Sequence, residues 1–488
     1  MSILIGYGMV FAFFVLVVYV MERTHVHSDS FVDYAIAGRS FGSWYQTMAF
    51  LNTWLPGTIF IAFAGLSAAS GVIGYYVAGY SLLAVLFMYY LADRVFEWGK
   101  RHDLKTQSDF VGMRYNSDRV RVVAAIIGVL SILPWLILGF QSLGLVFSYL
   151  SFGLFSPEQA VFIGIAVLAL RQYWTIKMGM RGIVISDMVQ GIIAYGVGGI
   201  LSIGFIIYLI NSGSGFDQLS QDFAMLPSFG STTGPLYYFA IVVTGALGAW
   251  CWPDIFVRLF TARSAQTVKN SAFKAAPLMF LFLALMLTAA MLASSLPEVA
   301  EAPDQVWFLL ASHAGPIVLS LAGICVLAAT IGNINALTQA IGVHAAQDIF
   351  HVKGGTDREI TRTARIIIAI TTLVAIVGAV MTANTASGLL TLALAAYQGV
   401  VQLAPALYLG LLLPWVTARG AEAGMIVGIV VAVLLQLLYP VSIPALYGLT
   451  SGVVGLIANV AVLIGVSLWR PQEGDEQQRL YTLFRPMS

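Results

Sequence analysis

Two short segments place helix-breaking residues inside long apolar runs, where freed backbone atoms could bind a ligand. The segment 52–58 contains Pro56 and Gly57, and the segment 245–254 contains several glycines and Pro253. Proline removes a hydrogen bond from a helix and glycine loosens its turn, so exposed carbonyl and amide groups can bind a solute or an ion. For either segment alone, a simple kink or a close helix contact remains an equally good interpretation.

The titratable residues form no pattern typical of an enzyme. His25 and His27 lie close together, but the other four histidines are scattered, so neither a metal site nor an activated nucleophile is indicated. A glycine-rich phosphate-binding loop is absent, which argues against an ATP-driven pump. We therefore expect no enzyme activity and no cofactor.

The composition indicates that the surrounding elements are membrane-spanning helices. The chain has 488 residues, of which 59% are hydrophobic and only 10% are charged, and its mean hydropathy is +0.87. An ordinary soluble domain carries about 25% charged residues. Apolar runs of about 20 residues, enough to cross about 30 Å of hydrocarbon, recur along the whole chain. The predicted fold class is an all-α polytopic membrane protein.

Apolar runs and polar punctuation predict about thirteen spans. The predicted ranges are 3–21, 43–68, 71–92, 122–148, 158–174, 183–211, 236–258, 276–295, 316–346, 366–382, 389–414, 421–439 and 446–469.

The basic residues orient these spans, because lysine and arginine accumulate in cytoplasmic loops. With thirteen spans, all 24 lysine and arginine residues fall in the loops on one side of the membrane and in the C-terminal tail on that same side. The opposite loops, such as 212–235 and 296–315, hold only acidic charges. We therefore predict a multi-pass protein of the inner membrane, with the N-terminus outside and the C-terminus cytoplasmic.

The two helix breaks fall at matching places of two five-span units, 43–211 and 236–414. A five-span unit that is repeated along the chain is necessarily inverted, and carriers often bind their solute at the midplane between such repeats. The remaining segments are an N-terminal span with an inner loop (1–42), an outer loop (212–235), and two C-terminal spans with a short tail (415–488).

Four segments resemble the sodium:solute symporter family in order and spacing. They are DYAIAGRSFG at 33–42, GMRGIVISDMVQ at 179–190, LGAWCWPDIFVR at 247–258, and the stretch from LAA to D at 327–348. The resemblance implies a leucine-transporter-type fold, with five plus five helices, one helix in front and two behind. It also implies alternating access, with sodium entering together with the solute.

The resemblance implies a sodium site between the break of the second span and the ninth span. Its ligands would come from Asn52, Leu55, Ala329, Gly332 and Asn333. The family's two hydroxyl ligands fall on Gly332, which has no side-chain oxygen, and on Asn333, which offers an amide. We expect this departure to weaken sodium binding, and a Gly332→Ser change to preserve or improve it.

The fold implied by the resemblance places the solute contacts on the two breaks and on the fourth and eleventh spans. The candidates are Thr53, Trp54, Gln141, Trp250, Trp252, Tyr397, Gln398 and Gln402. Aromatic walls with a few polar groups suit a small ligand. These segments show no charged residue at the expected midplane, so a doubly charged solute is not expected. The patterns around Pro134 and Pro405 resemble the monocarboxylate branch.

Several functions remain open at this point. The leading one is a symporter for a small organic solute, with sodium as the coupling ion. Proton coupling and uncoupled transport are alternatives, as is a membrane sensor that signals to a separate partner. A channel is disfavoured by the broken repeats. We expect the solute and the lipid bilayer as partners, with no nucleic acid and no obligatory protein partner.

Overall fold

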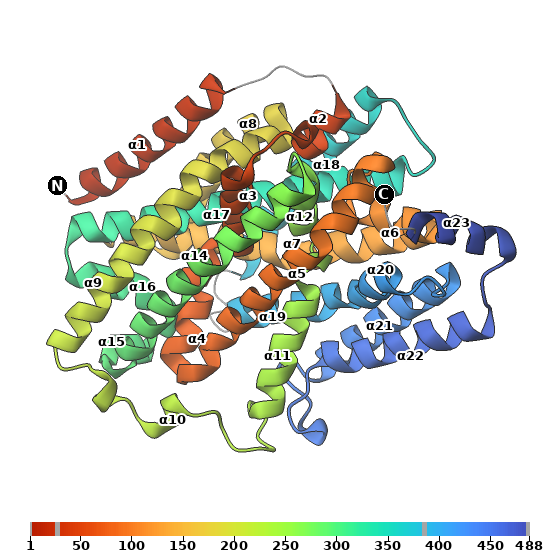
Figure 1. Ribbon diagram of the computed structural model, residues 1–488. Coiled ribbons are helices and arrows are strands. Elements are labelled where there is room, and N and C mark those ends of the chain that lie inside the picture. Colours follow the sequence, from red (N-terminus) through yellow and green to blue (C-terminus); the bar gives the residue numbers. More distant parts are fainter. Residues whose placement is uncertain (1, 25–29, 383–387, 485–488) are drawn as a thin grey trace.

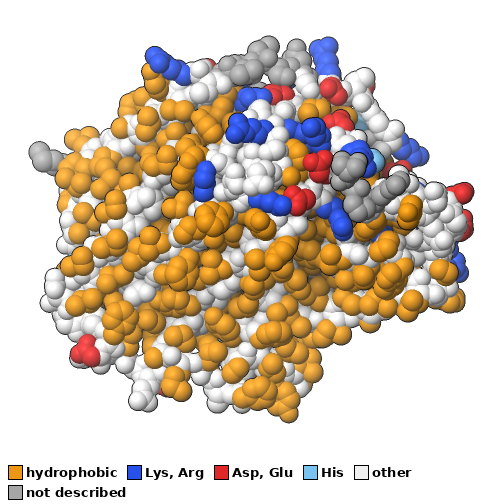
Figure 2. Space-filling model, in the orientation of Figure 1, with side chains coloured by type: hydrophobic (Ala, Val, Ile, Leu, Met, Phe, Trp, Pro, Cys, Tyr) orange, Lys and Arg blue, Asp and Glu red, His pale blue; other side chains and the backbone are white. Residues whose placement is uncertain are grey.

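The computed structural model describes residues 2–24, 30–382 and 388–484. Within these ranges the chain is almost entirely helical, and only two isolated bridges and no sheet are formed. Figure 1 shows the helices packed into one bundle. Figure 2 shows a broad hydrophobic surface, with lysine and arginine side chains gathered along its upper edge. The predicted all-α membrane fold is confirmed.

The first half of the bundle runs from α1 to α9, and its broken helix is formed by α3 and α4. Its elements are α1 (Ser2–Arg23), α2 (Phe31–Ile36), α3 (Ser43–Trp54), α4 (Ala62–Ser70), α5 (Tyr76–Arg101), α6 (Gln107–Tyr115), α7 (Asp118–Leu150), α8 (Pro157–Gly191) and α9 (Gly198–Asn211).

The second half begins after a connection that contains α10 (Gln221–Ala224). Its elements are α11 (Pro235–Gly248), α12 (Pro253–Phe256), α13 (Arg258–Thr261), α14 (Ala265–Leu292), α15 (Pro297–Glu301), α16 (Val306–His313), α17 (Pro316–His344), α18 (Asp357–Thr382), α19 (Gly388–Val400) and α20 (Gly410–Leu412). The chain ends with α21 (Ala418–Leu438), α22 (Ser451–Trp469) and α23 (Gly474–Phe484).

Each of the thirteen predicted spans falls on a helix or on a broken helix. By length and hydropathy alone, ten helices of the described part can cross a membrane, or eleven when the bent pair 235–261 is one span. Two ranges account for the difference. The range 43–68 is split into the short helices α3 and α4, and the range 158–174 is the first part of α8, whose apolar stretch Gln159–Leu168 is short.

A sharp bend in α8 separates the fifth and sixth predicted spans. Gly179 has φ 58° and ψ −145°, a backbone conformation that favours glycine. A Cβ atom there would lie 2.6 Å from the carbonyl oxygen of Tyr34, so the close approach of α2 also requires glycine. The signature segment 179–190 therefore begins at a turn and continues as a membrane helix.

Helix α17 and the two broken helices form the centre of the molecule (Figure 1). Every residue of α17 from Ala322 to His344 is buried. The chain before α3 pairs with the chain after α13, since the Phe41 amide donates to the Thr261 carbonyl (3.2 Å) and the Arg263 amide donates to the Phe41 carbonyl (3.1 Å). The two broken helices are thus joined at one end, on either side of the candidate site.

Candidate functional site

The break between α3 and α4 exposes backbone groups in the middle of the bundle. Leu55 leaves the helical region (φ −108°, ψ 77°), because proline at position 56 disfavours a helical conformation in the residue before it. Gly57 lies against α17, where a Cβ atom would meet the Thr330 hydroxyl at 1.8 Å. Asn52 to Trp54 remain helical, so the break begins slightly later than the sequence predicted.

The break after α11 is similar. Three residues of tighter helix (Ala249–Cys251) follow α11, and Trp252 is extended (φ −73°, ψ 122°) before α12 starts at Pro253. The two parts of the span meet at an angle of 55°. Residues 245–248 are regular helix, so here too only the C-terminal part of the predicted segment is broken.

A closed cavity of about 30 Å³ lies between the two breaks. It is lined by Thr53, Trp54, Pro56, Trp135, Trp252, Asp254, Ile255, Asn333, Leu337 and Tyr397. A pocket for a drug-sized ligand measures about 300–1,000 Å³, so the bundle is closed around this space.

Four of the eight predicted solute contacts line this cavity, namely Thr53, Trp54, Trp252 and Tyr397. Trp250 does not, because its indole N–H donates to the Ala84 carbonyl (2.9 Å) and its ring stacks on another aromatic side chain.

The three predicted glutamines also require a correction, because each lies against a neighbouring helix and outside the cavity lining. The Gln141 amide donates to the Thr382 hydroxyl (2.6 Å). The Gln398 side chain accepts from the Gly452 amide (2.9 Å), and the Gln402 amide donates to the Gly452 carbonyl (3.0 Å). Such interhelical hydrogen bonds satisfy amides that would otherwise be unpaired in an apolar environment.

Aromatic rings form one corner of the cavity. The centroids of Trp135 and Trp252 are 6.2 Å apart, those of Trp135 and Tyr397 are 5.9 Å apart, and those of Trp252 and Tyr397 are 5.3 Å apart. The three interplanar angles are 89°, 86° and 90°, so the rings are mutually perpendicular. Trp135 was not predicted from the sequence.

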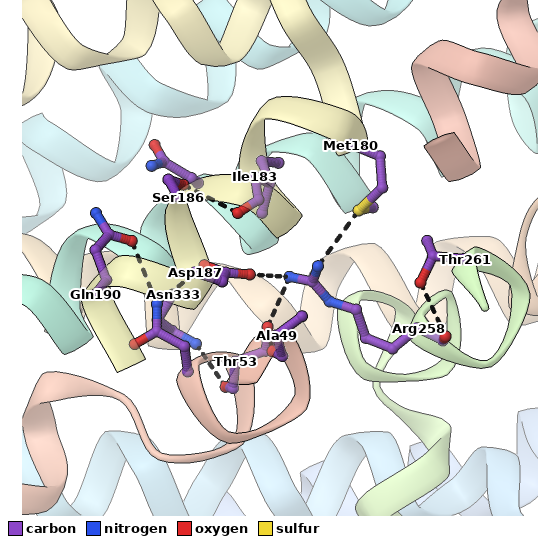
Figure 3. A network of polar contacts seen from close by, with 12 residues as sticks. Ala49, Thr53, Met180, Ile183, Ser186, Asp187, Gln190, Arg258, Thr261 and Asn333 are labelled. Carbon is purple, nitrogen blue, oxygen red and sulfur yellow. Dashed lines mark hydrogen bonds and ion pairs between the residues drawn. The ribbon is translucent and has the colours of Figure 1, made fainter. Parts of the chain in front are cut away.

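Charged residues lie next to the cavity, contrary to the sequence-based expectation. Arg258 and Asp187 are fully buried, and Nη2 of Arg258 lies 3.1 Å from Oδ2 of Asp187. The same nitrogen donates to the Thr53 hydroxyl at 2.7 Å, and Nη1 contacts the Met180 sulfur at 3.5 Å. Figure 3 shows the guanidinium pointing toward α8 and the end of α3. The ion pair and its Thr53 contact therefore connect α3, α8 and α13 beside the first break.

The predicted sodium position is filled by polar side chains of the protein itself. A Cβ atom at Gly332 would lie 1.8 Å from the side-chain nitrogen of Asn52, so this amide occupies the space of the missing hydroxyl. The same nitrogen donates to Asp187 (2.9 Å) and to Gln190 (3.3 Å). The Asn333 amide donates to the Thr53 carbonyl at 3.0 Å.

Tyr195 also contacts the break. Its hydroxyl donates to the carbonyl of Leu55 (2.7 Å) and lies 3.1 Å from that of Leu51 and 3.3 Å from the side-chain oxygen of Asn52. It lies in a π-helical segment, Ile192–Val197, and such segments often occur at functional sites. The Leu55 carbonyl and the Asn52 side-chain oxygen thus lie in one region, where a tyrosine hydroxyl contacts both, while the predicted sodium ligand from Asn52 was its backbone carbonyl.

Asp187, Gln190, Tyr195, Asp254 and Arg258 were not predicted as site residues. A signal was available for three of them, because ionisable residues inside apolar runs are rare and mark functional sites. Asp187, Asp254 and Arg258 belong to two of the family-like segments, where their charge alone should have singled them out.

These features define a class of protein. Two broken helices that face each other across a closed cavity, in a bundle of apolar helices long enough to cross a membrane, are the architecture of a leucine-transporter-type secondary carrier. The chain belongs to the sodium:solute symporter family, whose model matches residues 34–428. The resemblance seen in the sequence is therefore confirmed.

The individual relatives share about a quarter of their aligned residues with this chain. The chain is 25% identical to an uncharacterized symporter, YhjB of Bacillus subtilis (strain 168), over 89% of this chain and 91% of the relative. It is 24% identical to a monocarboxylate transport permease protein of Rhizobium johnstonii, over 54% of each chain.

Among solved structures, a Na⁺-coupled sialic acid symporter in a substrate-bound outward-open state superposes with a TM-score of 0.77 at 15% identity. The match covers 96% of this chain and 99% of that one. A nucleobase-cation-symport-1 family transporter in a closed conformation gives a TM-score of 0.55 at 15% identity, over 92% and 98% of the chains. At this identity, the two structures show the shared fold.

Proposed function

We propose that this protein is a sodium-coupled symporter that carries a small organic solute by alternating access. The observation that carries the proposal is the pair of broken helices around one closed cavity, with backbone and side-chain oxygens gathered beside the first break. Membership of the sodium:solute symporter family supports the same function. The two halves, 43–211 and 236–414, would act as the inverted repeats that move against each other.

The sodium ion would bind where α3 ends and α17 passes. Sodium is a hard cation that prefers oxygen ligands. The carbonyls of Leu55 and Ala329 and the side-chain oxygens of Asn52 and Asn333 can provide them, and the Asp187 carboxylate adds negative charge nearby. For Leu55 to bind sodium, the Tyr195 hydroxyl must first leave its carbonyl. Gly332 would take part only by leaving room for Asn52.

The solute would occupy an enlarged form of the cavity between the two breaks. A monocarboxylate is one candidate, since a distant relative bears the name of a monocarboxylate permease and the sequence resembles that branch. Asp254 weighs against a simple anion, because its carboxylate lines the same cavity. We therefore keep the proposal at a small organic solute of at most one net charge.

The orientation in the membrane belongs to the same proposal. The one-sided distribution of the basic residues, apart from Arg258, which is buried beside the cavity, supports an inner-membrane protein with its N-terminus outside and its C-terminus in the cytoplasm.

Uptake into proteoliposomes tests this function. Labelled organic acids, amino acids and amines would be supplied with an inward sodium gradient, an inward proton gradient, or no gradient. We expect concentrative uptake of at least one solute only with sodium. Uptake that follows the proton gradient, or that never exceeds equilibration, would contradict sodium coupling and favour the proton-coupled or uncoupled carrier.

A further inference from the structure

The strongest unassigned feature of the cavity is the carboxylate of Asp254. The side chain is only 3% exposed and lines the cavity, and its Oδ1 atom has no hydrogen-bond partner among the described residues. The nearby basic residue is Arg258, one helical turn away, whose guanidinium lies 3.1 Å from Asp187. Arg258 is thus the nearby guanidinium for two carboxylates, and the other contacts of the Asp254 carboxylate are the backbone amides of Asp254 and Ile255, so an ionised Asp254 would be only partly compensated. Such a buried charge is costly unless a cation joins it.

The walls beside Asp254 are suited to one kind of cation. Trp135, Trp252 and Tyr397 line the cavity together and stand at right angles to one another in T-shaped pairs. The face of an aromatic ring carries partial negative charge and attracts ammonium groups, and cages of such rings recognise them. The Trp135 indole N–H also lacks a partner among the described residues, and as a donor it suits an acceptor atom of the solute rather than the ammonium group.

Three cations could compensate Asp254, and the geometry separates them. A proton would need no aromatic walls. Sodium prefers oxygen ligands, and these gather at Asn52 and Leu55, beside the first break. An ammonium group uses both features of the cavity, since it can pair with a carboxylate and contact ring faces. The cavity of about 30 Å³ has room for a group the size of a primary ammonium, while a methylated ammonium or the rest of the solute would require opening.

We propose that the transported solute carries a positively charged ammonium group, which pairs with Asp254 and packs against Trp135, Trp252 and Tyr397. The solute is then an amine, an amino acid or a betaine-like zwitterion. This inference rests on the proposed transport function and names the class of solute for the same site.

Matched pairs of probes test this proposal on the full chain in lipid nanodiscs with sodium chloride. Choline and its neutral analogue 3,3-dimethylbutanol differ in charge and little in shape, and alanine and lactate differ in an ammonium against a hydroxyl group. Binding is followed by intrinsic tryptophan fluorescence, because three tryptophans line the cavity. We expect at least one ammonium probe to bind saturably, and its analogue to bind about tenfold more weakly or not at all.

Variants then assign the preference to the cavity. Asp254→Asn should weaken binding of the ammonium probe about tenfold or more. Glu301→Gln removes an exposed acidic residue from the loop 296–315 and should leave this binding unchanged. Trp135→Phe keeps a ring face and should retain the preference, while Trp135→Leu should lose it. If Asp254→Asn does not fold, the paired probes on the unchanged protein still test whether binding requires an ammonium group.

The outcomes also separate this inference from the proposed function. Equal binding within each pair, binding of lactate alone, or failure of every ammonium probe would overturn the ammonium site. Sodium-driven uptake of lactate would do so while leaving sodium symport intact. Conversely, ammonium uptake that ignores sodium would overturn sodium coupling and leave the ammonium site standing. An Asp254→Asn variant that changes only the sodium requirement would assign Asp254 to the coupling ion and overturn the inference.

Discussion

Asn52 and Gly332 share one space at the predicted sodium position. The Asn52 amide lies where a side chain at 332 would begin, and it bonds to Asp187 and Gln190 from there. The packing therefore argues against the expectation that Gly332→Ser as a single change preserves or improves sodium binding. A contact of 1.8 Å forces the asparagine to move.

We predict that Gly332→Ser alone raises the sodium concentration needed for half-maximal binding and lowers the melting temperature. Overpacking of this kind typically costs about 1–3 kcal/mol. The double variant Asn52→Ala with Gly332→Ser makes room for the hydroxyl and should recover much of both losses. Sodium titration by tryptophan fluorescence and a thermal melt measure the two quantities. If the double variant is worse than the sum of the single changes, the two residues do not share the space.

The Asp187–Arg258 pair illustrates the cost of a buried charge. We predict that Asp187→Asn destabilises the protein, because the buried Arg258 loses the carboxylate that lies 3.1 Å from its guanidinium. Since Asp254 remains nearby, the loss should stay below about 3–5 kcal/mol, the cost of a fully unpaired buried charge. Removing both charges, as in Asp187→Asn with Arg258→Met, should be less harmful than the single change. The comparison is made by thermal unfolding in nanodiscs. Additive losses in the double variant would show that the two groups do not stabilise each other.

At the level of elements, the π-helical turn of the sixth span controls access to the carbonyls of the broken helix. It directs the Tyr195 hydroxyl to the carbonyls of Leu51 and Leu55, one of which is a predicted sodium ligand. An ion bound at the proposed site would have to share this oxygen atom with the hydroxyl or displace the hydroxyl from it.

We predict that Tyr195→Phe lowers the sodium concentration required for half-maximal binding, because the Leu55 carbonyl becomes free. The lost hydrogen bonds should cost about 1 kcal/mol of stability. Phe282, whose ring packs on Tyr195, offers a control: Phe282→Leu changes the packing but leaves the hydroxyl in place. Weaker sodium binding in Tyr195→Phe would instead make the hydroxyl itself a ligand of the ion.

The connection between α14 and α17 packs on α4, the second half of the first broken helix. Asp304 lies against Gly65 of α4, where a Cβ atom would approach its Oδ1 to 2.3 Å. Burial raises the pKa of Asp304 from its ordinary value of 3.8 to about 6. The folded state thus holds this proton more tightly than the unfolded state.

The sign of the pH effect follows from this shift. Between about pH 4 and pH 6 the folded protein binds more protons, so its stability falls as the pH rises, and the loss persists above pH 6. We predict that Asp304→Asn increases the free energy of unfolding at pH 7.5 by at most about 2–3 kcal/mol, seen as a higher melting temperature, and has little effect at pH 4. A variant whose stability gain is the same at both pH values would contradict the shifted pKa.

The sequence predicted where the helices and their breaks lie better than it predicted which face of each helix is turned toward the cavity. Proline and glycine fixed the two breaks to within a few residues, because their backbone effects are local. The faces of the helices were not predictable, since spans that are apolar all round show no stripe that points inward. Gln141 and Gln402 were therefore assigned to the cavity although they face neighbouring helices, while Trp135 was missed.

For the molecule as a whole, the membrane orientation is the simplest prediction to test. We predict that a cysteine at Ser220 is labelled from outside and one at Gln478 only from the cytoplasmic side, since both positions are exposed. The native Cys251 and Cys325 are buried and give little background. Labelling of both positions from the same side would require an even number of spans between them.

The closed cavity also limits how fast the protein can work. With room for little more than a head group between the two breaks, each crossing requires the helices to part on one side and close on the other. Collective movements of this kind take microseconds to milliseconds. The flux should therefore saturate at a fixed turnover per molecule, and any associated current should be smooth and proportional to the number of molecules, without unitary steps.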